Sequence, residues 1–224
     1  MSDLLPAELR ELAEAVGPEP DELIEEMDAR ADREGFPTVG PAVGGWLALL
    51  ARVVDARRVF EFGSGFGYSA YWFARALPAD GEVVLTEVDH DELDDAREYF
   101  DRAGLSGRAR FEHGDAIETV AEYDGPFDVV LVDNEKSRYV EAFEAVRGKV
   151  REGGLVLADN AVTAGPIDRT DVLALLRGES VDASGVSEAS QGIADYLEHV
   201  RDAEGFETAL LPLGEGVAVS VKRG

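Results

Sequence analysis

The chain has 224 residues, 45% of them hydrophobic, and a formal net charge of −26. This composition is typical of one α/β domain with a full core and excludes a disordered chain. The lack of cysteine excludes disulfides, thiolate metal sites and cysteine nucleophiles. No apolar run reaches the roughly 18 residues of a membrane-spanning helix, and the N-terminus does not resemble a signal peptide, so we expect a cytoplasmic protein.

The acidic residues are spread along the whole chain, with 47 Asp and Glu against 21 Lys and Arg. Such a surface repels nucleic acids and anionic membranes, and we expect neither as a partner. Two interpretations stay open. The charge either forms a partner-binding surface or adapts the protein to high salt, where repulsion is screened. The even spread favours the second, a halophilic protein.

Amphipathic helices are predicted first, over residues 3–16, 19–33 and 42–54. Strands and helices then alternate. The predicted strands are 58–62, 82–88, 108–113, 127–133 and 154–159, and the predicted helices are 68–77, 91–103, 115–122 and 137–150. Short apolar strands with helical crossovers predict a parallel sheet that is covered on both faces.

The C-terminal part follows a different pattern. Residues 161–187 are rich in Gly, Ser and Asp with weak periodicity, and we expect a mobile loop there. A helix is predicted over 188–203, followed by strands within 206–214 and 215–223 that are joined by a glycine-containing turn. The two strands form a hairpin, so the last strand must run antiparallel to its neighbour.

Three glycines, Gly63, Gly65 and Gly67, follow the first predicted strand. Ligands of open parallel sheets bind at the carboxyl ends of strands, and glycine lets the backbone approach them closely. A dinucleotide loop, G-x-G-x-x-G, would need its third glycine at position 68, which is Tyr68. The loop therefore favours a ligand with a nucleoside and an amino-acid tail over one with phosphates.

Acidic residues follow the next two strands. Glu87 ends the second strand, where a carboxylate can accept both ribose hydroxyls. Asp115 follows the third strand in "HGDA", with Ala116 beside it, within reach of an adenine amine. Glu87 alone is equally well a solvated strand-end acid, but the ordered set of glycine loop, Glu87 and Asp115 favours a nucleoside pocket.

This order of motifs resembles the class I S-adenosylmethionine (SAM)-dependent methyltransferases, and more narrowly the metal-dependent catechol and caffeoyl-CoA O-methyltransferase family. The resemblance runs from about Thr38 to Lys222 and is carried by "PTVGPAVGGWLALLARVVDARRVFEFGSGFGYS", "DVVLVDNEKSRYVEAFEAV", "GGLVLADNAV" and "LLPLGEGVAVSVK". It implies a Rossmann-like seven-stranded, mostly parallel α/β sheet with helices on both faces and a C-terminal antiparallel strand. It also implies a methyltransferase domain over 41–224, with a helical extension over 1–40 packed on it as part of one domain.

The resemblance implies S-adenosylmethionine as the cofactor. Together with the loop pattern it predicts these cofactor-binding residues: Gly40, Glu61, Gly63, Gly65, Gly67, Tyr68, Ser69, Glu87, Asp115, Ala116 and Asp133. The family often has Ser or Thr in place of Gly40, so that side-chain contact is either lost here or replaced by backbone. Glu61 either orients the glycine loop or is a hydrogen-bonded acid near the end of the strand.

A second set of polar residues, Asp133, Asp159 and Asn160, follows the fourth and fifth strands. Adjacent parallel strands bring their carboxyl ends to one edge, where three oxygen donors would suit Mg²⁺. Asp-Asn pairs are also common in ordinary turns. By resemblance, these three residues match the family's metal ligands.

Lys136, three residues after Asp133, stands where the family has its catalytic lysine. The implied reaction methylates a hydroxyl of a small, aromatic vicinal diol. The metal favours loss of the hydroxyl proton, and Lys136 accepts that proton as general base. A solvated loop lysine is the plainer interpretation, although lysine is scarce in this arginine-rich chain.

Other functions stay open: a metal-independent methyltransferase for another small acceptor, a nucleotide-binding oxidoreductase, or a catalytically idle cofactor-binding protein. Tyr68 argues against the oxidoreductase. A CoA ester acceptor is disfavoured because few cations are present to meet its phosphates. Neither the acceptor nor the choice between monomer and homodimer can be derived from the sequence.

Overall fold

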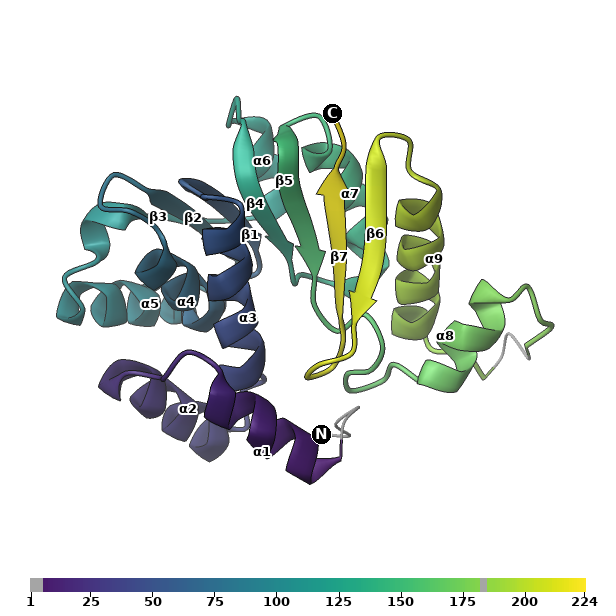
Figure 1. The fold of residues 1–224 in the computed structure, drawn as a ribbon, viewed down its shortest axis with the longest axis horizontal. Helices are drawn as coiled ribbons and strands as arrows, with labels where there is room; N and C mark the ends of the chain where they lie inside the picture. Colours follow the sequence, from purple (N-terminus) through teal and green to yellow (C-terminus); the bar gives the residue numbers. More distant parts are fainter. Residues whose placement is uncertain (1–5, 182–184) are drawn as a thin grey trace.

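A seven-stranded sheet forms the centre of the computed structural model, which describes residues 6–181 and 185–224 (Figure 1). Its strands are β1 (Arg58–Phe62), β2 (Glu82–Glu87), β3 (Ala109–His113), β4 (Phe127–Val132), β5 (Val150–Ala158), β6 (Phe206–Leu211) and β7 (Val217–Lys222). Their order in space is β3-β2-β1-β4-β5-β7-β6, with β1 to β5 paired in parallel. β7 runs antiparallel between β5 and β6, which confirms the predicted fold class.

Helices cover both faces of the sheet and one of its ends. The α-helices of the described residues are α1 (Ala7–Val16), α2 (Glu22–Glu34), α3 (Gly40–Val53), α4 (Tyr68–Ala76), α5 (His90–Arg102), α6 (Ala116–Ala121), α7 (Tyr139–Val146), α8 (Arg169–Leu176) and α9 (Glu188–Asp202). Buried side chains of α3, α4 and α5 pack on one face, and those of α6, α7 and α9 on the other. Helices α1 and α2 lie beyond the carboxyl ends of the parallel strands (Figure 1). This arrangement places them beside the edge where a ligand would bind.

The two-residue period of the strands divides the core into two layers. In β1, Val59 belongs to the layer that contains Trp72, whereas Phe60 and Phe62 belong to the layer that contains Phe143. Because both faces are covered, the central strands are apolar on both sides and appear in the sequence as nearly continuous hydrophobic runs.

The predicted loop over 161–187 is wrong for its middle part, because α8 occupies Arg169–Leu176. Residues 182–184 of that range lie outside the described residues. The sequence of α8 has little helical periodicity of apolar residues: Val172 is buried, whereas the equally apolar Leu173 next to it is exposed. Its N-cap was nevertheless a usable signal, since the Asp168 side chain accepts a hydrogen bond from the Thr170 amide at 2.7 Å.

The predicted helix over 137–150 is also shorter than expected. A 3-10 turn over Lys136–Arg138 precedes α7, and the chain enters β5 at Val150 rather than at 154. Gly153 and Gly154 lie inside β5, whose pairing with β4 shifts register between Phe127 and Val129. The other predicted boundaries within the described residues agree to within three residues; the predicted start of the first helix at residue 3 lies outside them.

No helix in the described parts of the chain combines the length and apolar character needed to cross a bilayer.

Close packing of α3 on α4 gives a first test of the fold. A Cβ atom at Gly44 of α3 would lie 2.2 Å from Nε1 of the buried Trp72. We expect Gly44→Ala to lower the free energy of unfolding by roughly 1–3 kcal/mol, because the indole has no room to move. Urea unfolding measures this change. Gly148→Ala is the control, since nothing lies within 4 Å of its Cβ position. Equal stability of the two variants would contradict this packing.

Candidate active site

Backbone hydrogen bonds continue the parallel pairing of β1, β4 and β5 one residue beyond the strands, so the carboxyl ends of these strands lie side by side. The Asp133 amide donates to the Phe62 carbonyl at 2.9 Å, and the Asp159 amide donates to the Val132 carbonyl at 3.1 Å. These bonds fix where the loops after β4 and β5 leave the sheet. Both aspartates therefore emerge on the same edge as the glycine loop after β1.

A cavity of about 460 Å³ opens at this edge. It is lined by these predicted site residues: Gly63, Gly65, Tyr68, Ser69, Glu87, Asp133, Lys136, Asp159 and Asn160. The structure therefore brings the predicted catalytic lysine, the three predicted metal ligands and much of the predicted cofactor set to one place. We call this space the central cavity.

The remaining predicted residues lie around it. Asp115 and Ala116 line a neighbouring cavity of about 320 Å³, here called the side cavity, which shares three residues with the central cavity: Gly63, Glu87 and Asp133. Gly40 lines a third cavity of about 510 Å³. Gly67 caps α4 and faces Ala96 of α5, and Glu61 is fully buried in β1.

The glycine loop is tightly enclosed. Gly63 has φ of 77°, and a Cβ atom there would lie 2.7 Å from the Asp133 carbonyl oxygen. Gly65 has φ of 48°, and its Cβ would lie 2.6 Å from the Phe36 ring. Both positions combine a left-handed backbone with a close neighbour, so only glycine fits without displacing Asp133 or Phe36.

Glu87 holds the loop in this position. One carboxylate oxygen accepts a hydrogen bond from the Gly65 amide at 2.8 Å, and the other accepts from the Val88 and Asp89 amides at 2.8 and 2.9 Å. Three of the roughly four lone pairs of the carboxylate are used by these contacts, so the oxygen that accepts from Gly65 keeps capacity for one ligand hydroxyl. Glu87 thus faces the central cavity from a fixed position.

Glu61 is a buried acid behind the loop. The Ser69 hydroxyl donates to Glu61 Oε1, while Oε2 has no hydrogen-bond partner among the described residues. Burial raises the pKa of Glu61 to about 8; the Ser69 hydrogen bond opposes this rise, and the charges of Asp133 and Glu87 add to it. At neutral pH the group is therefore mostly a neutral acid. These contacts connect Glu61 to the loop through Ser69.

Lys136 is fixed by three acceptors. Its Nζ donates to Asp133 Oδ1 at 2.8 Å, to the Tyr139 hydroxyl at 2.7 Å and to the Asn134 carbonyl at 3.3 Å. The Tyr139 hydroxyl in turn lies 3.2 Å from the Asp159 carbonyl, to which it donates. Tyr139 is fully buried, and its hydroxyl joins the loops that carry Lys136 and Asp159.

The negative charges of Asp133 and Asp159 are only partly compensated by their surroundings. Burial raises the pKa of Asp133, an effect that Lys136 opposes, and burial and the Asp133 charge raise the pKa of Asp159 to about 8. Asp159 Oδ1 is buried and has no hydrogen-bond partner among the described residues. A bound cation would satisfy this oxygen, so the donor set fits a divalent ion. Within the described residues, however, no three His, Cys, Asp or Glu side chains cluster as a metal site.

Two residues at the site were missed by the sequence reasoning. Arg138 pairs with Asp115, an interaction that lowers the pKa of Asp115, and so engages the carboxylate predicted to face adenine. Glu215 accepts a hydrogen bond from Asn160 Nδ2 at 2.6 Å and lines the central cavity. A charged residue between two glycines of the predicted hairpin turn was the available signal for Glu215.

The family model for O-methyltransferases matches residues 20–223. The chain belongs to this family. The predicted family is therefore confirmed, and the protein is a class I SAM-dependent O-methyltransferase. The catechol O-methyltransferase of Niastella koreensis is 35% identical over 162 residues, which cover 70% of this chain and 73% of the relative.

Two further relatives extend this comparison. Caffeoyl-CoA O-methyltransferase 3 of Nicotiana tabacum is 25% identical over 208 residues, covering 90% of this chain and 83% of the relative. The O-methyltransferase from Bacillus cereus, solved in complex with SAH, superposes with a TM-score of 0.80 at 26% identity, covering 96% of this chain and 97% of that one. SAM-dependent methyl transfer and the fold are thus supported over nearly the whole chain.

Glu61 makes the ligand-free protein sensitive to pH. Because its pKa is raised in the folded state, its contribution to stability is present below its pKa in the unfolded chain and is lost as the pH rises through about 8. From about pH 5 to about pH 9, the unaltered protein should lose roughly 2–4 kcal/mol more unfolding free energy than Glu61→Gln. Urea unfolding at each pH measures the difference. The exposed Glu207→Gln should follow the unaltered protein, and parallel curves for Glu61→Gln would refute the assignment.

Proposed function

We propose that this methyltransferase transfers the methyl group of S-adenosylmethionine to a hydroxyl of a small aromatic vicinal diol, with help from a divalent cation such as Mg²⁺. The observation that carries the proposal is that Asp133, Asp159, Asn160 and Lys136 line the same cavity as the glycine loop. The relatives named as catechol and caffeoyl-CoA O-methyltransferases support a phenolic acceptor.

The donor cleft combines the central and side cavities. Their shared residues, Gly63, Glu87 and Asp133, make one continuous surface from the glycine loop to Asp115. An elongated cofactor can lie along it, with its nucleoside towards Asp115 and its amino-acid end towards Ser69. Holding the sulfonium and the acceptor oxygen in line supplies much of the rate enhancement of such a transfer.

The proposed ion would be held by the carboxylates of Asp133 and Asp159 and by the Asn160 amide. The partnerless Asp159 Oδ1 and the raised pKa of both aspartates fit a site that needs a cation. When bound, a divalent ion favours the deprotonated form of a hydroxyl that contacts it.

Lys136 is the proposed proton acceptor. Its Nζ lies at the cavity wall, held by Asp133 and by the Tyr139 hydroxyl. A general base needs this kind of fixed position within hydrogen-bond reach of the proton that it takes. We assign Tyr139 as a positioning residue, because it acts on the acceptor only through Lys136.

Methyl transfer without a metal is the second candidate. It is favoured by one observation: the Lys136 ammonium already neutralises part of the Asp133 charge. In that case the ammonium alone would stabilise the developing oxyanion of the acceptor.

Removal of metal separates these two candidates. With catechol as acceptor, we expect EDTA to lower turnover at least 100-fold and added Mg²⁺ to restore it, while SAH binding measured by calorimetry stays within about threefold. Asp159→Asn should reproduce the loss of turnover in the presence of Mg²⁺. Full activity in EDTA would refute the metal role and support the second candidate.

Substitution of Lys136 tests the proton acceptor. Lys136→Met should lower kcat about 10²–10⁴-fold with SAH affinity nearly unchanged, as expected for loss of a general base. Lys136→Arg keeps the positive charge but cannot accept the proton at neutral pH, and should be equally impaired. If Lys136→Arg retains most of the activity, the lysine acts through its charge alone.

A further inference from the structure

Helix α9 packs directly against the turn that carries the proposed proton acceptor. A Cβ atom at Gly192 of α9 would lie 2.5 Å from the carbonyl oxygen of Lys136, 2.8 Å from its carbonyl carbon and 2.9 Å from the Cα atom of Ser137. All three neighbours are backbone atoms, which cannot turn aside as the end of a flexible side chain can. Glycine at position 192 therefore allows an approach of two backbones that any side chain would prevent.

A second contact, one helical turn later, joins α9 to the residue that holds the lysine ammonium. The Tyr196 ring packs edge-to-face on the Tyr139 ring, with centroids 5.5 Å apart. The Tyr139 hydroxyl accepts a hydrogen bond from Lys136 Nζ at 2.7 Å. Because residues four apart lie on the same face of a helix, Gly192 and Tyr196 form one surface. This surface contacts the backbone of Lys136 and supports the partner of its ammonium.

The helix is anchored by contacts that do not involve this turn. Ser187 caps its N-terminus by accepting a hydrogen bond from the Ser190 amide at 3.0 Å, and the Ser187 hydroxyl donates to the Pro166 carbonyl at 2.7 Å. Further along, Ile193 and Val200 are fully buried in the core. The helix has 15 residues and the 3-10 turn has three, so a group added at position 192 would displace the turn more readily than α9.

We propose that Gly192 and Tyr196 are positioning residues for methyl transfer, which fix the Lys136 ammonium at the wall of the central cavity. The proposal rests on the proposed function, in which Lys136 takes the proton of the acceptor. Neither Gly192 nor Tyr196 lines the central cavity, so both act on the reaction through Lys136. A misplacement of about 1 Å can cost roughly 10²-fold in rate, and we expect a smaller loss from one added methyl group.

Loss of stability is the competing explanation, because a methyl group in a tight contact also strains the fold. The two explanations differ in their dependence on Lys136. A general loss of stability acts whether or not the lysine is present, whereas a positioning effect disappears when the positioned group is removed. Gly44→Ala is the matched control, because it places a methyl group against Trp72 in another helix contact, outside the lining of the central cavity.

The first measurement is a double-mutant cycle on turnover, with catechol as acceptor and radiolabelled SAM as donor. We expect Gly192→Ala to lower kcat about tenfold, with the KM for catechol and the affinity for SAH nearly unchanged. In a Lys136→Met background, the same substitution should change kcat by about twofold or less. Gly44→Ala should keep kcat close to that of the unaltered protein at a temperature at which both are folded.

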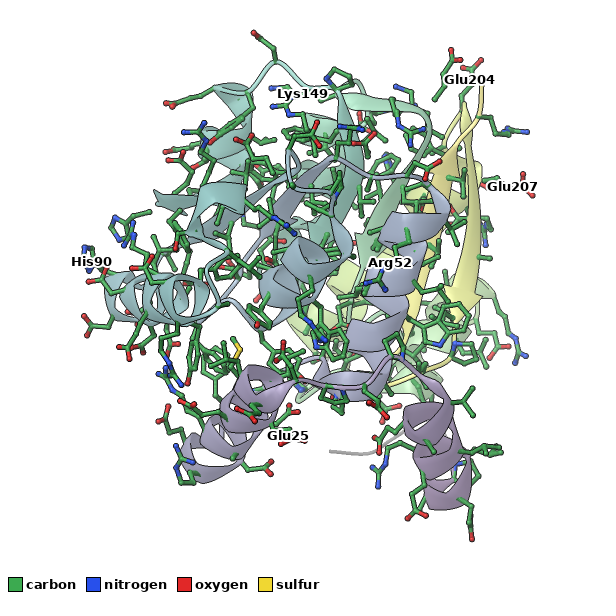
Figure 2. All side chains as sticks on the ribbon, turned by 60° about the vertical axis from the view of Figure 1, so that its left-hand side comes forward. Glu25, Arg52, His90, Lys149, Glu204 and Glu207 are labelled. Atoms are coloured by element: carbon green, nitrogen blue, oxygen red, sulfur yellow. The ribbon has the colours of Figure 1, made fainter. Side chains whose placement is uncertain are left out.

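The second measurement observes Lys136 by NMR without turnover. The chain has three lysines, Lys136, Lys149 and Lys222, so labelling with ¹³Cε-lysine gives three lysine signals from the SAH complex. Lys136→Met assigns the signal of interest. Lys149 lies at the end of the molecule away from Glu25 of α2 (Figure 2), and Lys222 ends β7, so both are internal references. At constant pH, Gly192→Ala should shift the Lys136 signal and leave the other two in place.

Tyr196 provides a second test that does not depend on the folding of Gly192→Ala. Tyr196→Leu removes the ring that packs on Tyr139. It should lower kcat and shift the Lys136 signal, as Gly192→Ala does. Tyr196→Phe keeps the ring and should restore most of the activity.

Three results would overturn the proposal: an unchanged Lys136 signal in both Gly192→Ala and Tyr196→Leu, the same fold loss of kcat with and without Lys136, or an equal loss in Gly44→Ala. Full turnover by Lys136→Met would instead refute the proposed proton acceptor. The NMR signal would then decide by itself whether α9 fixes the position of the lysine.

Discussion

The parallel ladder between β1, β4 and β5 is the constraint on which the site depends. Its last rungs are the backbone hydrogen bonds from Asp133 to Phe62 and from Asp159 to Val132, which lie beyond the strands themselves. A slip of one residue would turn every side chain of a strand to the opposite face. The two-layered apolar core opposes such a slip, so the same packing that stabilises the sheet also fixes the two aspartates beside the glycine loop.

Buried carboxylates give this edge its chemical character. Glu61, Asp133 and Asp159 are all removed from water, and burial raises the pKa of each. The positive partner within hydrogen-bond reach is Lys136, which contacts Asp133. A site with this balance favours ligands that bring positive charge, and the sulfonium of S-adenosylmethionine is one of them. The sulfonium of the donor and the proposed divalent ion would thus both be stabilised by the buried carboxylates.

The sequence predicted the sheet, the glycine loop and the residues at the strand ends, because short apolar runs that alternate with helices indicate parallel strands, whose carboxyl ends lie at one edge. It could not predict Glu215 or the pairing of Arg138 with Asp115, because these contacts depend on how loops distant in sequence fold over the edge. Helix α8 was missed because it buries one side chain and shows no clear period. Salt adaptation and a cytoplasmic location stay predictions, as does the role of each site residue.

Glu215 belongs to a turn between two C-terminal strands, yet it contacts Asn160, which follows β5, and lines both the central cavity and the third cavity, of about 510 Å³. The turn thus ties the C-terminal hairpin to the edge where the parallel strands end, across 55 residues of sequence. A change in the length of this turn would therefore reshape the walls of two cavities at once.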